Sequence, residues 1–164
     1  MRSAIREVID SARSDLVLAS YSLLGIAHQR SADKPARPEL LLDPVRAAVD
    51  RGVEVRLLLR GRNIDDATRR EAATFADAGV PIVPDRLNHA KGVIVDAVRG
   101  ALFSANFVPH MGLFGGVEVG LRLDDTLALA EASRCFVHAG PRPTSTSYVT
   151  RPWPSWRQAC TRSP

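Results

Sequence analysis

Residues 43–59 read DPVRAAVDRGVEVRLLL, and this stretch holds a helix signal followed directly by a strand signal. We expect a helix over 43–51, because Asp43 can cap its start, Pro44 suits the first helical position and Gly52 suits the end. The alternating and then apolar residues 53–59 predict a largely buried strand. A helix that leads directly into a buried strand is typical of α/β proteins.

The same alternation continues on both sides of this stretch. Upstream we expect a helix over 3–13, a buried strand over 15–21 and a surface loop over 25–42. Downstream we expect a helix over 65–78 that ends at Gly79, strands over 80–83, 90–95, 101–103 and 117–123, and a helix from Asp124 to about 138. This order predicts an α/β sandwich with a mixed, mostly parallel sheet flanked by helices on both faces.

The length of 164 residues favours one domain, which we place over 1–139, followed by a Pro-rich extension over 140–164. A hydrophobic content of 45% with 24% charged residues excludes a wholly disordered chain. No apolar run approaches the roughly 20 residues of a membrane span, so we expect no stable membrane insertion. The first residues lack the apolar core of a signal peptide, so we expect a cytoplasmic protein.

The net charge is +4, with 22 basic and 18 acidic residues, and 20 of the basic residues are arginine. This balance favours a polyanionic partner over a cationic one, although an arginine bias alone is weak evidence for nucleic-acid binding. Cys135 and Cys160 have no metal-ligand spacing, so we expect no metal, no cofactor and no disulfide framework. Cys135 lies in an apolar helical pattern, which predicts a small core residue.

An unusual combination of polar side chains interrupts the apolar strands in the second half of the chain. On a strand His89 and Lys91 would share one face about 7 Å apart, and Ser104 and Asn106 would share a face in the same way. Singly, each has an ordinary explanation as a surface histidine, a turn residue or a solvent-facing polar group. Together they supply a nucleophile or base, a cation, two neutral donors and an orienting carboxylate, which can stabilise a phosphate transition state without a metal. The set is His89, Lys91, Asp96, Ser104, Asn106 and Glu118.

The spacing His89-x-Lys91-x4-Asp96, followed by Ser104 and Asn106, resembles the HKD motif of the phospholipase D superfamily. It is most similar to the small bacterial phospholipase D-like endonucleases, which have a single motif. The resemblance covers about residues 4–138, from the first helix and strand onward. It implies the αβα sandwich of that family. One position departs from the family pattern, because Phe103 stands where the family usually has glycine immediately before the serine.

The resemblance implies a two-step reaction at His89. One ring nitrogen would attack phosphorus to form a covalent phosphohistidine, and Glu118 would hold the proton of the other nitrogen. Lys91, Ser104 and Asn106 would bind the non-bridging oxygens as charge builds on them. Asp96 would complete the catalytic motif as a structural partner rather than as a direct contact of the substrate.

A second histidine must protonate the leaving oxygen, and the chain has no second His-x-Lys motif. His28 and His138 lack the lysine, and we expect His110 in a loop. Small family members with one motif form their site across a two-fold axis. The resemblance therefore implies a homodimer in which His89 and its symmetry mate act as nucleophile and acid.

Several functions remain open at this stage. A nuclease that cleaves DNA or RNA is the leading hypothesis, with Arg60, Arg62, Arg69 and Arg70 as either a phosphate-binding rim or an ordinary solvated face. A phospholipid hydrolase or transferase is the second, with the apolar residues 111–116 as an interfacial surface. The third is a non-catalytic nucleic-acid-binding module, and the chain could also be part of a larger defence or repair system.

Overall fold

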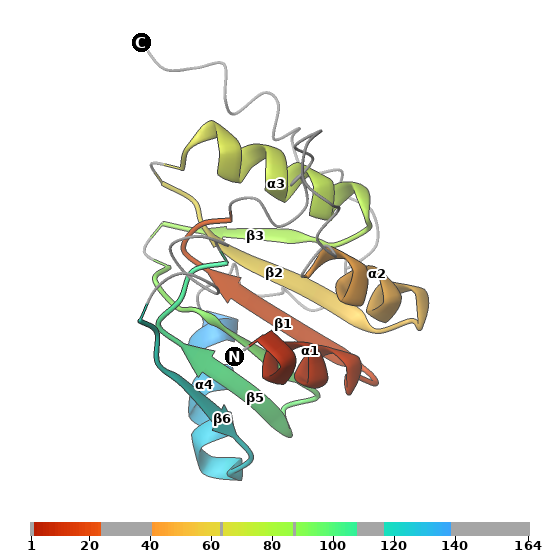
Figure 1. The fold of residues 1–164 in the computed structure, drawn as a ribbon, viewed down its shortest axis with the longest axis vertical. Helices are drawn as coiled ribbons and strands as arrows, with labels where there is room; N and C mark the ends of the chain where they lie inside the picture. Colours follow the sequence, from red (N-terminus) through yellow and green to blue (C-terminus); the bar gives the residue numbers. More distant parts are fainter. Residues whose placement is uncertain (1, 24–40, 63, 87, 108–116, 139–164) are drawn as a thin grey trace.

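The computed structural model describes residues 2–23, 41–62, 64–86, 88–107 and 117–138. Ten helices and strands follow one another in these segments (Figure 1). The first half contains α1 (Arg2–Asp10), β1 (Asp15–Ser20), α2 (Leu42–Asp50), β2 (Glu54–Arg60), α3 (Asp66–Asp77) and β3 (Ile82–Asp85). The second half contains β4 (Gly92–Val95), β5 (Arg99–Phe103), β6 (Gly120–Leu123) and α4 (Thr126–His138). Each matches an element expected from the sequence to within a few residues.

The six strands form one sheet in the order β3-β2-β1-β4-β5-β6. β1, β2 and β3 are parallel, whereas β4 pairs antiparallel with β1, β5 with β4 and β6 with β5. The predicted α/β class and mixed sheet are confirmed, with one correction: three of the five strand pairs are antiparallel, so the sheet is not mostly parallel. The reason is the connections, because α2 and α3 bridge the parallel pairs while a short turn joins β4 to β5.

Helices cover both faces of the sheet, as predicted. α1, α2 and α3 pack on one face, and α4 packs on the opposite face, behind the sheet in Figure 1. Strand residues alternate between the two sides, so that Leu16 and Leu18 belong to the first core while Val17 and Ala19 belong to the second. The α4 side is completed by Leu129, Ala132 and Phe136. Burial on both faces explains why the central strands are almost continuously apolar.

Gly92 allows α4 to lie close to the sheet at the start of β4. A Cβ at this position would stand 2.7 Å from the carbonyl oxygen of Ala101 and 3.2 Å from the ring of Phe136. Neither the backbone of β5 nor a packed aromatic ring can yield that much space. The glycine that follows Lys91 is therefore required by packing.

The helix ends agree partly with the sequence signals. Gly52 and Gly79 follow α2 and α3 with positive φ, as expected. Asp65 caps α3 by accepting a hydrogen bond from the Thr68 N–H. The predicted Asp43 cap is wrong, since α2 begins one residue earlier with Leu41 at its N-cap. α4 begins after Asp125, whose carboxylate accepts from the Ala128 N–H.

Cys135 corrects another expectation, because it is exposed on α4 rather than buried in the core. Its neighbours Ala132 and Phe136 face the sheet instead. The loop predicted over 25–42 lies almost entirely outside the described residues, and Cys160 and the predicted extension over 140–164 lie wholly outside them. Among the described helices, none is both long and apolar enough to cross a bilayer.

Candidate functional site

Four of the predicted site residues lie at one edge of the sheet, where the ends of neighbouring strands meet. β1, β2 and β5 end at this edge, while β4 and β6, which run the opposite way, begin there (Figure 1). His89 and Lys91 precede β4, Ser104 follows β5, and Glu118 precedes β6. Four residues that are spread over 30 positions of the sequence thus meet at the same edge.

His89 and Lys91 are in direct contact. Lys91 Nζ lies 2.9 Å from Nδ1 and 3.4 Å from Nε2 of His89. The expected strand begins only at Gly92, so the pair lies in the segment just before β4, but the two side chains share one side as predicted. The ring of Tyr21, the residue after β1, meets the His89 ring edge-on with centroids 5.2 Å apart.

The buried Asn88 holds the segment that carries His89. Its side-chain amide donates to the carbonyl oxygens of Ser20 and Leu58, at 3.0 and 3.4 Å. Its Oδ1 accepts from the Ala90 N–H at 3.0 Å, which fixes the backbone on both sides of the histidine. Sequence reasoning missed Asn88 and Tyr21, because a lone asparagine and a lone tyrosine carry no spacing signal. Only the strand order brings them to His89.

Ser104 and Glu118 form a second pair at the same edge. The Ser104 hydroxyl donates a short hydrogen bond to the Glu118 carboxylate and accepts one from the Val119 N–H at 3.0 Å. Partial burial lowers the pKa of Lys91 from its ordinary value, while the negative charge of Glu118 acts in the opposite direction and raises it. The sequence predicted a contact between Glu118 and His89, but no such contact is found among the described residues.

Asn106 lies two residues beyond Ser104 and is half-buried. Its carbonyl oxygen is buried without a hydrogen-bond partner, so no described protein group orients the amide. The next residue, Phe107, is anchored by its N–H to Ser20 Oγ at 3.2 Å. Asn106 is thus held at the edge through its backbone while its side chain remains uncommitted.

Phe103 replaces the usual glycine without blocking the site. Its ring is buried in the core on the α1 side and packs against Phe107, with centroids 5.6 Å apart. Phe103 pairs with Gly120 of the edge strand β6, where no side chain competes for the space above the strand. Pairing an aromatic residue with a glycine across an edge is a known way to stabilise such a strand.

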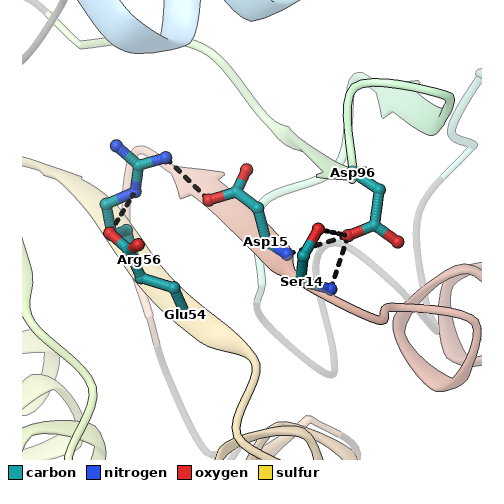
Figure 2. Close-up of polar contacts among 5 residues, drawn as sticks. All are labelled: Ser14, Asp15, Glu54, Arg56 and Asp96. Carbon is teal, nitrogen blue, oxygen red and sulfur yellow. Dashed lines mark hydrogen bonds and ion pairs between the residues drawn. The ribbon is translucent and has the colours of Figure 1, made fainter.

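Asp96 lies at the opposite edge of the sheet, after the end of β4, and is not brought to His89. Its carboxylate accepts hydrogen bonds from the N–H groups of Ser14 and Asp15 and from the Ser14 hydroxyl, all at 2.8 Å (Figure 2). It also accepts one from the Arg13 N–H at 2.9 Å. Partial burial raises the pKa of Asp96, but these hydrogen bonds outweigh it and lower the pKa to about 2. Asp96 therefore ties the turn after β4 to the α1–β1 turn, and its place is structural rather than catalytic.

The same anchor continues into the sheet. Asp15 forms an ion pair with Arg56 at 2.8 Å, and Arg56 also approaches Glu54 at 4.0 Å (Figure 2). These residues link the starts of β1 and β2 to the carboxylate of Asp96. The edge opposite His89 is thus held by a continuous polar network.

A cavity of about 560 Å³ opens beside the edge that carries His89, on the α4 side of the sheet. His89, Lys91 and Ser104 line one end, and Leu102, Cys135 and Phe136 line the apolar remainder. Val117, Val119 and Leu121 are strongly exposed on and just before the neighbouring edge strand β6. The site is therefore open, and an apolar surface borders it.

The remaining histidines and the basic rim are only partly described. His28 and His110 lie outside the described residues. Within the described segments there is no group of three or more His, Cys, Asp or Glu side chains that could hold a metal ion. Of the predicted rim, Arg60 stacks over the Tyr21 ring, whereas Arg69 is paired with Asp66 at 3.0 Å.

Comparison with protein families matches residues 5–138 to the family described as cardiolipin synthase, PLD-like domain. No curated protein matches the chain. Among solved structures, the phospholipase D family member Nuc from Salmonella typhimurium aligns with a TM-score of 0.65 and 22% identity, over 85% of this chain and 88% of Nuc. NucT from Helicobacter pylori aligns with a TM-score of 0.61 and 18% identity, over 84% of this chain and 85% of NucT.

A third solved structure is similar over only part of its own length. TrmBL2, an archaeal chromatin protein described as having a novel mode of DNA binding, aligns with a TM-score of 0.53 and 19% identity. The alignment covers 82% of this chain and 45% of TrmBL2. At these identities the solved structures establish the fold that the chain shares with them.

Proposed function

The chain belongs to the phospholipase D-like family, as its motif predicted, and we propose that it is a metal-independent phosphodiesterase that cleaves DNA or RNA. The observation that carries the proposal is the direct contact between His89 and Lys91 at an edge that also presents Ser104 and Glu118. A nucleophile, a cation and a hydroxyl donor then surround one open position, and each has the chemistry that a phosphodiester requires.

His89 acts as the nucleophile in this mechanism. The ammonium group of Lys91 lies 2.9 Å from Nδ1 and 3.4 Å from Nε2, and it can only donate a hydrogen bond, so the ring nitrogen that it contacts acts as the acceptor in this mechanism. When Lys91 turns to the phosphate, the lone pair of this nitrogen attacks phosphorus, the P–N bond forms, and the P–O bond to the leaving group breaks. Water then attacks phosphorus, the histidine that protonated the leaving oxygen takes the proton of the water, and the P–N bond breaks to release the phosphate product and restore the imidazole.

Lys91, Ser104 and Asn106 bind the non-bridging oxygens. Lys91 supplies charge, Ser104 turns its hydroxyl from Glu118 toward the phosphate, and the side-chain NH₂ group of Asn106 donates to a phosphate oxygen. Glu118 keeps the serine oriented and helps to keep Lys91 charged. Asp96 contributes only by stabilising the fold at the far edge.

The leaving oxygen needs a proton, and we propose that His89 of a second copy supplies it in a homodimer. The exposed residues Val117, Val119 and Leu121 border the site and offer apolar surface that a second copy would bury. Light scattering or sedimentation at micromolar concentration is the direct test. An active protein that is monomeric under the assay conditions would contradict the shared site.

Nucleic acid is the proposed substrate because the net charge is +4 and because Arg60 contacts the same Tyr21 ring that His89 contacts. The similarity to TrmBL2, a protein described by its DNA binding, is consistent with this choice. A phospholipid hydrolase or transferase is the second candidate, and the apolar cavity of about 560 Å³ beside His89 is the observation that favours it.

The experiment that tests the proposal is a cleavage assay in the presence of a chelator. Labelled single- and double-stranded DNA and RNA are compared with phospholipid vesicles, and His89→Ala is the control. Cleavage of a nucleic acid that survives chelation and disappears in His89→Ala is the expected result. Cleavage of vesicles alone would favour the second candidate. Binding of nucleic acid without any cleavage or covalent phosphohistidine would indicate a non-catalytic binding module.

A further inference from the structure

Arg60 ends β2 at the catalytic edge and lies over the ring of Tyr21. Its guanidinium carbon is 4.7 Å from the ring centroid, which is the geometry of a cation–π contact. Its Nε donates to the carbonyl oxygen of Arg62 at 3.2 Å. Two contacts thus fix the plane of a half-buried guanidinium.

The same ring of Tyr21 contacts the catalytic pair. His89 meets it edge-on at 5.2 Å between centroids, and Lys91 Nζ lies 5.9 Å from its centroid. Arg60 and His89 therefore contact the same aromatic ring. A substrate held at His89 and Lys91 would extend past Tyr21 toward Arg60 if its chain continued in that direction.

Arg60 differs from Arg56 and Arg69, two nearby arginines whose charges are paired with carboxylates. Arg56 is paired with Asp15, and Arg69 is paired with Asp66. Within the described part of the chain, Arg60 has no carboxylate partner, and its terminal nitrogens make no hydrogen bond that competes with a ligand. A guanidinium that is oriented in advance binds a phosphate in bidentate fashion with little further loss of freedom.

We propose that Arg60 binds a phosphate adjacent to the scissile one, and that the enzyme therefore selects chains of linked phosphodiesters over isolated diesters. The inference rests on the proposed function and specifies its substrate class. A nucleic-acid strand carries one phosphate per roughly 3.4 Å of duplex axis, so a neighbouring phosphate is always available near the scissile one. A small diester or a phospholipid with a single phosphate has no such group.

The test compares two substrates. One is a labelled single-stranded oligonucleotide and the other is bis(4-nitrophenyl) phosphate, which has a single phosphate. Arg60→Met removes the charge and keeps the aliphatic stem, while Arg51→Met makes the same charge change at the opposite edge of the sheet. Thermal unfolding of each variant confirms that both remain folded.

We expect Arg60→Met to lower kcat/KM on the oligonucleotide about tenfold and to leave the small diester nearly unchanged. The slope of log(kcat/KM) against log salt should fall by about 0.7, the value for one phosphate contact on a single strand. Arg51→Met should change neither quantity. Equal losses on both substrates, or no loss on the oligonucleotide, would overturn the role of Arg60.

Failure of the proposed function gives a different result. A protein that binds the oligonucleotide but cleaves neither substrate would refute the phosphodiesterase activity. The salt dependence of oligonucleotide binding, measured by fluorescence anisotropy for the wild type and Arg60→Met, would still decide whether Arg60 contacts phosphate. An unchanged slope in that measurement would refute the contact.

Discussion

The carboxylate of Asp96 supports the fold through four hydrogen bonds, and Asp96→Asn is the variant that weakens them most selectively. Oδ1 accepts from the Ser14 N–H, the Ser14 hydroxyl and the Asp15 N–H, and Oδ2 accepts from the Arg13 N–H. In asparagine one oxygen becomes an NH₂ group, which would face the Arg13 N–H as donor against donor. Asparagine also tolerates the positive φ of 53° at this position, so the backbone is not a confounding factor.

The size of the effect follows from the pKa of Asp96. Folding lowers this pKa from the ordinary 3.8 to about 2, and one pKa unit corresponds to about 1.4 kcal/mol. The carboxylate remains partly exposed to solvent, so the stabilisation is discounted to roughly 1–2 kcal/mol. We expect Asp96→Asn to lower the free energy of unfolding at pH 7 by that amount, which for a chain of this size lowers Tm by about 3–7 °C.

The loss should depend on pH with a definite sign. Because the folded pKa is lower than the unfolded one, the stabilisation is complete above about pH 4 and is lost as the pH falls toward 2. The gap between wild type and Asp96→Asn should therefore be constant at neutral pH and narrow in acid. Urea unfolding at pH 7 and pH 3 measures it, with Asp77→Asn, an exposed aspartate at the end of α3, as control. A gap below 0.5 kcal/mol at pH 7, or one equally large at pH 3, would refute the reasoning.

Three further predictions concern single residues. Asn88→Ala should lower kcat by about 100-fold with a smaller change in KM, because His89 loses the hydrogen bonds that hold its segment. Steady-state kinetics on the folded variant measures kcat and KM separately, and equal changes in kcat and KM would argue against a positioning role. Glu118→Gln should move the alkaline limb of the pH profile of kcat/KM to lower pH. The substitution removes the negative charge that raises the pKa of Lys91, while partial burial still lowers that pKa. An alkaline limb that does not move would count against Lys91 as the titrating group. Ala97→Gly should raise stability by about 0.5–1 kcal/mol, because Ala97 has a positive φ of 52°, whereas Ala76→Gly on the exposed side of α3 should lower it in the same thermal assay.

Much of the fold could be predicted from the sequence because its signals are local. The run DPVRAAVDRGVEVRLLL contains a helix, a stop and a buried strand within 17 residues, and the structure has α2, Gly52 and β2 there. Strand direction is not a local property. Three of the five strand pairs are antiparallel, and the turn that makes β4 and β5 antiparallel contains Asp96 and Ala97, which both have positive φ although neither is glycine.

The candidate site shows the same division. The proximity of His89 and Lys91 could be predicted because residues two positions apart in an extended segment project from the same face, whichever strands lie beside them. Tyr21, Arg60 and Asn88 belong to three different segments, and they reach His89 only because β1 lies between β2 and β4. That order depends on long-range pairing, so no pattern within a short window of the sequence could have revealed it.

The four residues between Lys91 and Asp96 in the motif correspond to one strand of the sheet. Those four residues are β4, which spans the sheet from the catalytic edge to the edge held by Asp96 over roughly 13 Å. Under the proposed function, the motif joins two roles through one strand: His89 and Lys91 carry the chemistry at its start, and Asp96 anchors the turn at its end. If so, Asp96→Asn should reduce the amount of folded enzyme at elevated temperature while leaving the specific activity of the folded fraction unchanged. A fall in kcat at a temperature where the variant is fully folded would show that the two ends of β4 are coupled in catalysis as well as in stability.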